Sequence, residues 1–240
     1  MIGIPASSVI SSGRALLEDP YLANVVLVVP LETDFADVKG HAYSLRGTPT
    51  LTSPSISGYG NNSGDFTGGG KSIEFVDSDD FIMQTTHTAE IWCQPSGEDI
   101  SGSHASGFHS LFGQREGGGS GYSLAISGGK FTLWTGDTNW FVSSTPGNPL
   151  LTSGQNYHVA IVFTPTQMRF YLNGILTISV VVSSYNFGNK AATFNIGVDS
   201  FPLWDANAQF FYGKLKNFRL TQGIARYTSN FTPPAGFVSV

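Results

Sequence analysis

The sequence has few charged residues and only one cysteine. Charged side chains make up 12% of the 240 residues, about half the usual share, and the net charge of −5 contains no block of like charge. This distribution gives no electrostatic footprint for nucleic acid. A single cysteine, Cys93, excludes an internal disulfide and a cysteine-based metal site. Because it lies in an apolar stretch with Ile91, we expect a small buried side chain.

Long hydrophobic runs are also missing. The apolar stretch from Leu22 to Leu31 is too short to span a bilayer, so we expect no membrane insertion. The first 20 residues lack a basic start followed by a continuous apolar core, and we expect no secretory signal. They also show no helix or strand period. We therefore interpret residues 1–20 as an N-terminal extension outside the core.

Glycine, proline and aromatic residues are plentiful instead. The chain has 29 Gly, 12 Pro and 18 Phe, which is typical of a fold with many short strands and turns. No stretch has a convincing amphipathic helix period. The sequence therefore predicts an all-β sandwich of the jelly-roll type.

Residues 155–177 are the stretch around which we expect the sheets to be organised. The apolar run 157–163 is nearly continuous, and we expect it to be a central strand covered on both faces. The run 168–172 alternates apolar and polar side chains, and the turn Asn173-Gly174 leads into a third run, 175–182. These features predict two successive antiparallel hairpins.

Other strands are expected on both sides of this stretch. They cover residues 24–31, 43–47, 50–52, 72–76, 81–84, 88–94, 108–115, 122–127, 130–135, 140–144, 192–198 and 210–221. Residues 53–71 are interpreted as a Gly/Ser-rich connection, and residues 96–107 as a polar loop. His104 and His109 lack zinc-ligand spacing and are interpreted as solvated loop residues.

Five blocks in order resemble the laminin G-like (LamG) jelly-roll domains of the concanavalin A-like lectin/glucanase superfamily. They are residues 68–75, 89–92, 157–160 with 170–174, 194–197, and 212–227 with 230–234, the last reading YGKLKNFRLTQGIARY and then NFTPP. The last block is similar to the closing segment of LamG-like domains in bacteriophage structural proteins. It departs from that pattern at Lys216-Asn217, where an acidic pair is usual. The resemblance implies two curved antiparallel sheets, a domain spanning residues 21–234 and a tail at 235–240.

The resemblance also implies a function. We expect a non-enzymatic phage virion protein, either a capsid decoration or a tail appendage, that binds a host-surface glycan. Its N-terminal arm would contact other virion proteins, the protein would form a homo-oligomer, and it would be made in the host cytoplasm. The alternatives are a free-standing or cell-surface bacterial carbohydrate-binding module and a degenerate glycoside hydrolase. Enzymes of this superfamily cluster carboxylates on one strand, whereas Glu90 is followed by Ile91, Trp92 and Cys93.

Aromatic and polar residues in the predicted loops are the candidates for glycan binding. A sugar ring stacks on a flat aromatic face beside hydrogen-bonding groups, and Trp140, Trp204 and Tyr122 with Asn139 and Asp137 supply both. Trp134 and Phe201 are further aromatic candidates. The competing interpretation is that aromatic residues fill the core, and this is what we expect of Trp92.

Asp199 and Asp205, which flank a loop, are the candidates for a calcium site of the kind that some LamG relatives carry. Calcium needs six to eight oxygen ligands. The alternative is that both aspartates cap turns in the backbone, since no EF-hand spacing is present.

Overall fold

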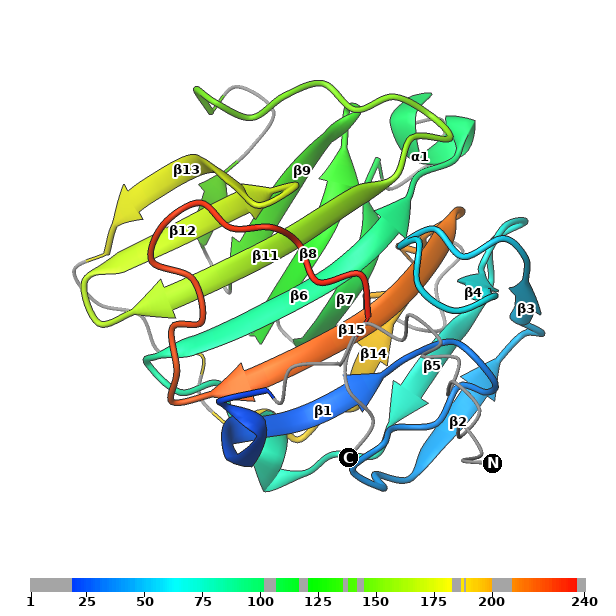
Figure 1. The fold of residues 1–240 in the computed structure, drawn as a ribbon, viewed down its shortest axis with the longest axis horizontal. Helices are drawn as coiled ribbons and strands as arrows, with labels where there is room; N and C mark the ends of the chain where they lie inside the picture. The colour runs from blue at the N-terminus through cyan, green and yellow to red at the C-terminus, as the bar shows by residue number, and fades with distance from the viewer. Residues whose placement is uncertain are drawn as a thin grey trace, which may run out of the picture.

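The structure is a computed structural model that describes residues 19–101, 107–116, 121–135, 145–182, 187, 189–199 and 209–236, and the backbone of 138–141. Its strands form two antiparallel sheets packed face to face (Figure 1). Sheet A contains β1 (Val25–Val29), β3 (Thr50–Thr52), β4 (Ser63–Asp65), β6 (His87–Gln94), β11 (Tyr157–Thr164), β12 (Gln167–Leu172), β13 (Ile175–Val181) and β15 (Lys214–Gln222). Sheet B contains β2 (Tyr43–Arg46), β5 (Ser72–Phe75), β7 (His109–Arg115), β8 (Gly121–Ser127), β9 (Lys130–Thr135), β10 (Thr138–Phe141) and β14 (Phe194–Ile196). The predicted all-β sandwich is confirmed.

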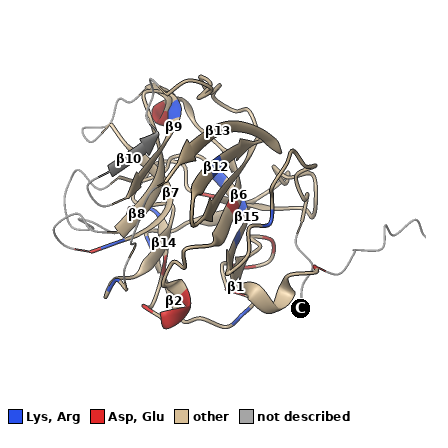
Figure 2. Cartoon of the chain, turned by 90° about the vertical axis from the view of Figure 1, so that its left-hand side faces the viewer, with Lys and Arg blue, Asp and Glu red and all other residues tan. Residues whose placement is uncertain are grey.

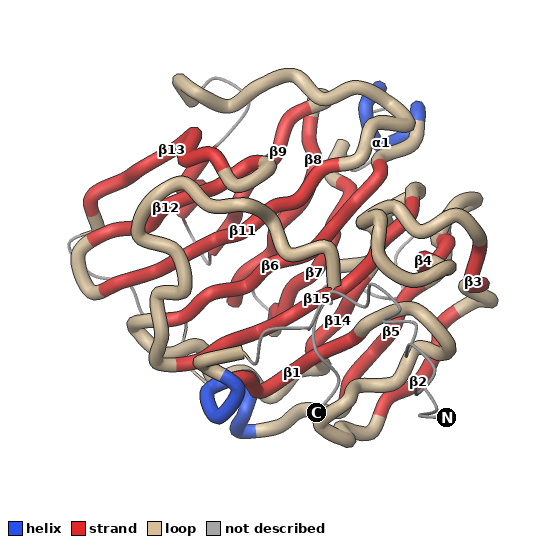
Figure 3. Tube along the Cα trace, in the orientation of Figure 1, coloured by secondary structure: helices blue, strands red, loops and turns tan. Residues whose placement is uncertain are grey.

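The strand order explains how distant segments meet. Sheet A runs β13-β12-β11-β6-β15-β4-β3, with β1 paired to β15, and sheet B runs β10-β9-β8-β7-β14-β5-β2. In the described part of the chain the helical elements are α1 (Gly97–Ser101) and the 3-10 turns η1 (Leu22–Asn24) and η2 (Asp79–Phe81) (Figure 3). No helix in that part has the length and hydrophobicity needed to cross a membrane.

One core fills the space between the sheets, which Figure 2 shows edge-on. Ten phenylalanines in the described part of the chain are at most 2% exposed: Phe66, Phe75, Phe81, Phe112, Phe131, Phe163, Phe170, Phe194, Phe211 and Phe218. Each stabilises the fold by about 1.5–3 kcal/mol relative to an exposed side chain. Cys93 is also fully buried, as expected, and burial raises the pKa of its thiol well above the usual range.

The predicted central strand is β11, which lies between β12 and β6. Val159 and Ile161 face the core between the sheets. Ala160 and Val162 face the other side, where Tyr227 and Phe231 cover them. Both faces of β11 are therefore buried, which is why its sequence is a continuous apolar run.

Residues 223–236 form the cover on the outer face of sheet A, and we name them the C-terminal strap. The red segment of Figure 1 shows the strap crossing this face. The Phe231 N–H donates to the Gly174 carbonyl at 2.9 Å, and the Trp92 indole N–H donates to the Pro234 carbonyl at 2.9 Å. Trp92 therefore lies half-buried beneath the strap, and the expectation that it belongs to the core was wrong because its β6 position faces outward.

Several local expectations were also wrong. The connection 53–71 contains β4, whose Gly64 packs so closely against Phe66 and Leu31 that a side chain there would press on both. Residues 81–84 form no strand, because η2 occupies 79–81 and its Ser78 side chain accepts the Asp80 N–H. The polar loop 96–107 begins with α1.

Candidate functional site

A cleft lies on the outer face of sheet B. In the β8–β9 hairpin Leu124 and Leu133 are core residues, so their neighbours Ser123 and Trp134, which pair with each other, face outward. The cleft over this hairpin has a volume of about 130 Å³. Its described lining residues are Phe108, Arg115, Ser123, Ala125, Thr132, Trp134, Asp199 and Gln209. We name it the sheet B cleft.

Arg115 connects the two sides of the sheet B cleft. Its guanidinium carbon lies 3.7 Å from the centroid of the Trp134 ring. Its Nη1 donates to the Asp199 Oδ2 at 2.5 Å. The Arg115 side chain is 12% exposed and that of Asp199 is 1% exposed, so solvent and salt screen this ion pair less than a surface pair.

Further polar groups extend this face across the sheet. Ser123 pairs in register with Gly113 on β7, and Gly113 pairs with Asn195 on β14. The Ser123 hydroxyl bonds the Ser110 hydroxyl at 2.7 Å. Asn195 is fully buried, and neither its amide nitrogen nor its amide oxygen has a hydrogen-bond partner. A buried polar group without a partner costs about 1–3 kcal/mol of stability. Packing alone therefore does not explain why an asparagine stands at this position.

The predicted glycan-binding residues have different outcomes. Asp137 and Trp204 lie outside the described residues. Asn139 and Trp140 belong to the edge strand β10, of which the structure describes the backbone, and Asn139 pairs in register with Trp134 of the cleft. These predictions remain predictions.

Tyr122 does not offer an exposed aromatic face. It is 4% exposed and packs against Phe187 and Phe194, with ring centroids 5.7 and 6.3 Å away. The physical reason is the strand period, because Tyr122 shares the inward face of β8 with Leu124 while Ser123 faces outward. The prediction that Tyr122 stacks on a sugar is corrected accordingly.

The structure describes one of the two calcium candidates. Asp205 lies outside the described residues, and Asp199 holds the Arg115 guanidinium. A cation at the Asp199 Oδ2 would have to displace that guanidinium, and the calcium site remains a prediction. No group of three or more His, Cys, Asp or Glu side chains in the described part of the chain could hold a metal ion.

The segment 209–213 leaves the cleft and crosses from sheet B to sheet A. The Gln209 carbonyl accepts the Ser110 N–H at 3.0 Å, and the Gly213 carbonyl accepts the Phe66 N–H at 2.9 Å. Between them, the Tyr212 N–H donates to the buried Asp99 carboxylate at 2.9 Å. Burial raises the pKa of Asp99 to about 6, although the N–H groups of Ser96 and Tyr212 oppose the shift.

His109 lies beside Asp99 and is fully buried at the start of β7. Its Nδ1 is 3.1 Å from the Phe210 carbonyl and 3.5 Å from the Asp99 Oδ1. The interpretation of His109 as a solvated loop residue was therefore wrong, since β7 begins at this residue. His104 lies outside the described residues.

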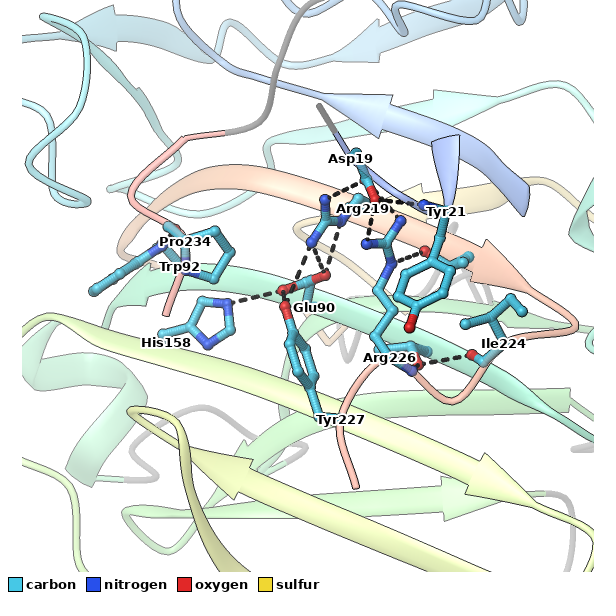
Figure 4. A network of polar contacts seen from close by, with 12 residues as sticks. Asp19, Tyr21, Glu90, Trp92, His158, Arg219, Ile224, Arg226, Tyr227 and Pro234 are labelled. Atoms are coloured by element: carbon cyan, nitrogen blue, oxygen red, sulfur yellow. Dashed lines mark hydrogen bonds and ion pairs between the residues drawn. The ribbon is translucent and has the colours of Figure 1, made fainter. Parts of the chain in front are cut away.

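The outer face of sheet A holds a buried network (Figure 4). Glu90 Oε1 accepts from Arg219 at 2.6 and 2.8 Å, and Glu90 Oε2 accepts from the Tyr227 hydroxyl at 2.8 Å and lies 3.2 Å from His158 Nε2. Asp19 accepts from both Arg219 and Arg226 at 2.8 Å. The network therefore joins β6, β11, β15, the C-terminal strap and the residue at which the described chain begins.

Charge pairing determines the ionisation of this network. Burial opposes the ionisation of Glu90, but the charge of Arg219 and the hydrogen bond from His158 overcome it and lower the pKa of Glu90 to about 2. Burial and the charge of Glu90 raise the pKa of the Tyr227 hydroxyl, so this group stays a donor. Glu90 is thus an ionised structural carboxylate without a carboxylate partner beside it.

Comparison with known proteins identifies the family. The model of the Laminin_G_3 family, in the concanavalin A-like lectin/glucanases superfamily, matches residues 67–224. The chain belongs to the Laminin_G_3 family. The match covers the cleft, Glu90 and β15, and it agrees with the two antiparallel sheets. A search of curated proteins gives no match.

Solved structures share the Laminin_G_3 fold at low sequence identity. Domain 4 of AbnA, an extracellular arabinanase from Geobacillus stearothermophilus in complex with arabinotriose, has a TM-score of 0.63 and 18% identity over 83% of this chain and 93% of that chain. The serotype D botulinum neurotoxin ligand-binding domain in complex with N-acetylneuraminic acid has a TM-score of 0.59 and 15% identity over 87% and 48%. The binding domain of Paraclostridial Mosquitocidal Protein 1 has a TM-score of 0.60 and 12% identity over 83% and 49%. This Laminin_G_3 chain spans about half the length of both toxin chains.

Sequence reasoning missed most of the cleft. The strand period of the β8–β9 hairpin would have placed Ser123, Thr132 and Trp134 on one face, and this signal was available. The pairing of Arg115 with Asp199 joins residues 84 positions apart, and no local pattern indicates it.

Proposed function

We propose that this Laminin_G_3 protein is a non-enzymatic glycan-binding module and that the sheet B cleft is its sugar site. The observation that carries the proposal is the composition of the cleft. A partly buried indole, Trp134, lies beside the side chains of Ser123, Thr132 and Gln209. Specific small-molecule sites combine an apolar surface with a few polar groups that fix orientation. Sugars present both apolar ring faces and hydroxyl groups to such a surface.

The similar structures support a carbohydrate ligand. One is a complex with arabinotriose and another a complex with N-acetylneuraminic acid. Since fold does not imply function, the site itself carries the argument.

The carboxylates of this face support a binding role over hydrolysis. Glycoside hydrolysis needs one carboxylic acid to protonate the leaving group and a second carboxylate as base or nucleophile. Glu74 on β5 is held by Arg46 at 2.8 Å, and Asp199 is held by Arg115. Both are therefore engaged by guanidinium groups, an arrangement that suits structural ion pairs better than the acid and base of a hydrolase.

Replacing Trp134 tests the proposed sugar site. A glycan array should reveal a bound sugar, and Trp134→Ala should weaken that binding by roughly 1–3 kcal/mol, by analogy with aromatic stacking on nucleobases. Trp92→Ala is the matched control, because Trp92 is also half-buried but lies on the outer face of sheet A. This control should bind the sugar like the wild type while unfolding at a lower temperature. Wild-type binding that Trp134→Ala leaves unchanged would exclude the cleft.

The finer proposal places the module on a phage virion, as a capsid decoration or tail appendage. Its support is the closing block, residues 212–234, which resembles phage structural proteins. The N-terminal extension would contact other virion proteins in a homo-oligomer. Residues 1–18 of it lie outside the described residues, whereas Asp19 is clamped by Arg219 and Arg226. Mass spectrometry of purified particles should detect the protein, and particles without it would contradict this placement.

A further inference from the structure

The charges of the sheet B cleft cancel each other. Among its described lining residues Arg115 and Asp199 are the charged ones, and they form an ion pair. The Arg115 guanidinium is engaged by the Asp199 carboxylate and by the face of the Trp134 ring. The remaining polar side chains, Ser123, Thr132 and Gln209, are neutral donors and acceptors.

An acidic sugar would meet an obstacle in this arrangement. The favourable position for its carboxylate is beside Arg115, the cationic group of the described lining. There it would have to share the guanidinium with Asp199. Two carboxylates around one guanidinium repel each other, and the repulsion is strong because Asp199 is shielded from water. A neutral sugar meets no such repulsion, since its hydroxyl groups can donate to Asp199 and accept from Arg115 without separating the pair.

We infer, on the basis of the proposed function, that the sheet B cleft selects neutral glycans and that Asp199 is the residue that rejects acidic ones. The similar structures include a neutral ligand, arabinotriose, and an acidic one, N-acetylneuraminic acid. The inference assigns the cleft to the neutral class. Specificity here comes from a repulsive element as well as from favourable contacts.

The experiment compares sugars that differ only in charge, such as oligomers of galactose and of galacturonic acid, together with arabinotriose and N-acetylneuraminic acid. The wild type should bind a neutral member more tightly than its acidic counterpart. Asp199→Asn keeps the side-chain size and removes the negative charge, so it should increase the affinity for acidic sugars at least tenfold. Glu74→Gln is the matched control, because it removes one negative charge from the same face outside the described cleft lining. It should leave the preference unchanged.

A second measurement needs no variant. Binding of a neutral sugar to the wild type should change less than twofold between low and high salt, because no net charge is neutralised on binding. Wild-type binding that favours the acidic member of a pair, or an unchanged preference in folded Asp199→Asn, would overturn the inference and leave the proposed function standing. Absence of binding to any sugar would overturn the proposed function itself.

Discussion

Two buried carboxylates show how differently the two sides of the sandwich are built. On the outer face of sheet A, Glu90 is surrounded by Arg219, His158 and the Tyr227 hydroxyl, and its pKa is lowered to about 2. Beside His109 at the start of β7 in sheet B, Asp99 is held by the N–H groups of Ser96 and Tyr212, and its pKa is raised to about 6. Burial opposes ionisation at both sites, and at Glu90 the charge of Arg219 and the hydrogen bond from His158 overcome it.

The C-terminal strap covers the outer face of sheet A, whereas the sheet B cleft lies on the opposite outer face. The C-terminal strap brings Arg226 and Tyr227 to the outer face of sheet A, where they complete the network of Figure 4. The strap therefore stabilises its own docking through buried charge pairs. On sheet B, the ion pair of Arg115 and Asp199 forms part of the cleft wall.

The largest effect is expected from breaking the network on sheet A. Glu90→Gln keeps the shape of the side chain but leaves Arg219 and Arg226 with Asp19 as the remaining carboxylate of the network. Breaking a buried pair in this way costs about 3–5 kcal/mol, because it leaves an uncompensated buried charge. Chemical denaturation should show this loss, while the folded variant should bind sugar like the wild type.

Glu74→Gln is the control for this variant too. Glu74 pairs with Arg46, whose side chain is 38% exposed, so the loss should be below about 1 kcal/mol. If Glu90→Gln and Glu74→Gln lower the free energy of unfolding equally, the Glu90 network stabilises the fold no more than the exposed ion pair of Glu74 and Arg46 does.

The sequence predicted the architecture better than the sites. Periodicity and turn signals identified β8, β9, β11, β12 and β13, because these strands are long and their hairpins are local. Short strands such as β4 depend on packing from distant residues, as Gly64 does on Leu31 and Phe66. The roles of Glu90 and Asp199 depend on arginines that are 129 and 84 residues away. Local patterns carry no information about such pairs.

The pH dependence of stability tests the raised pKa of Asp99, and the expected effect is smaller than that of Glu90→Gln. In the unfolded chain Asp99 loses its proton near pH 3.8, whereas in the folded chain it keeps the proton up to about pH 6. Its contribution is therefore fully present below pH 3.8 and is lost as the pH rises through 6, and the difference between the two pKa values corresponds to about 3 kcal/mol. The contribution of the buried His87 to stability has the opposite pH dependence. Burial lowers the pKa of His87 from 6.5 to about 4, so its contribution is present above pH 6.5 and is lost as the pH falls through 4.

These two contributions are similar in size and opposite in direction, so they should nearly cancel in the wild type between pH 7 and pH 4. Asp99→Asn removes one of them, and its free energy of unfolding should fall by roughly 2 kcal/mol more than that of the wild type over this range. His87→Gln removes the other, and its free energy of unfolding should rise by a similar amount relative to the wild type on acidification. Each substitution also has a cost in stability that does not depend on pH. For Asp99→Asn this cost includes weaker hydrogen bonds from the N–H groups of Ser96 and Tyr212. Comparing each variant with itself at the two pH values cancels this constant cost. Urea denaturation at pH 7 and pH 4 measures the differences. An Asp99→Asn profile parallel to that of the wild type would show that Asp99 titrates normally in the fold, and the contrast with Glu90 would then disappear.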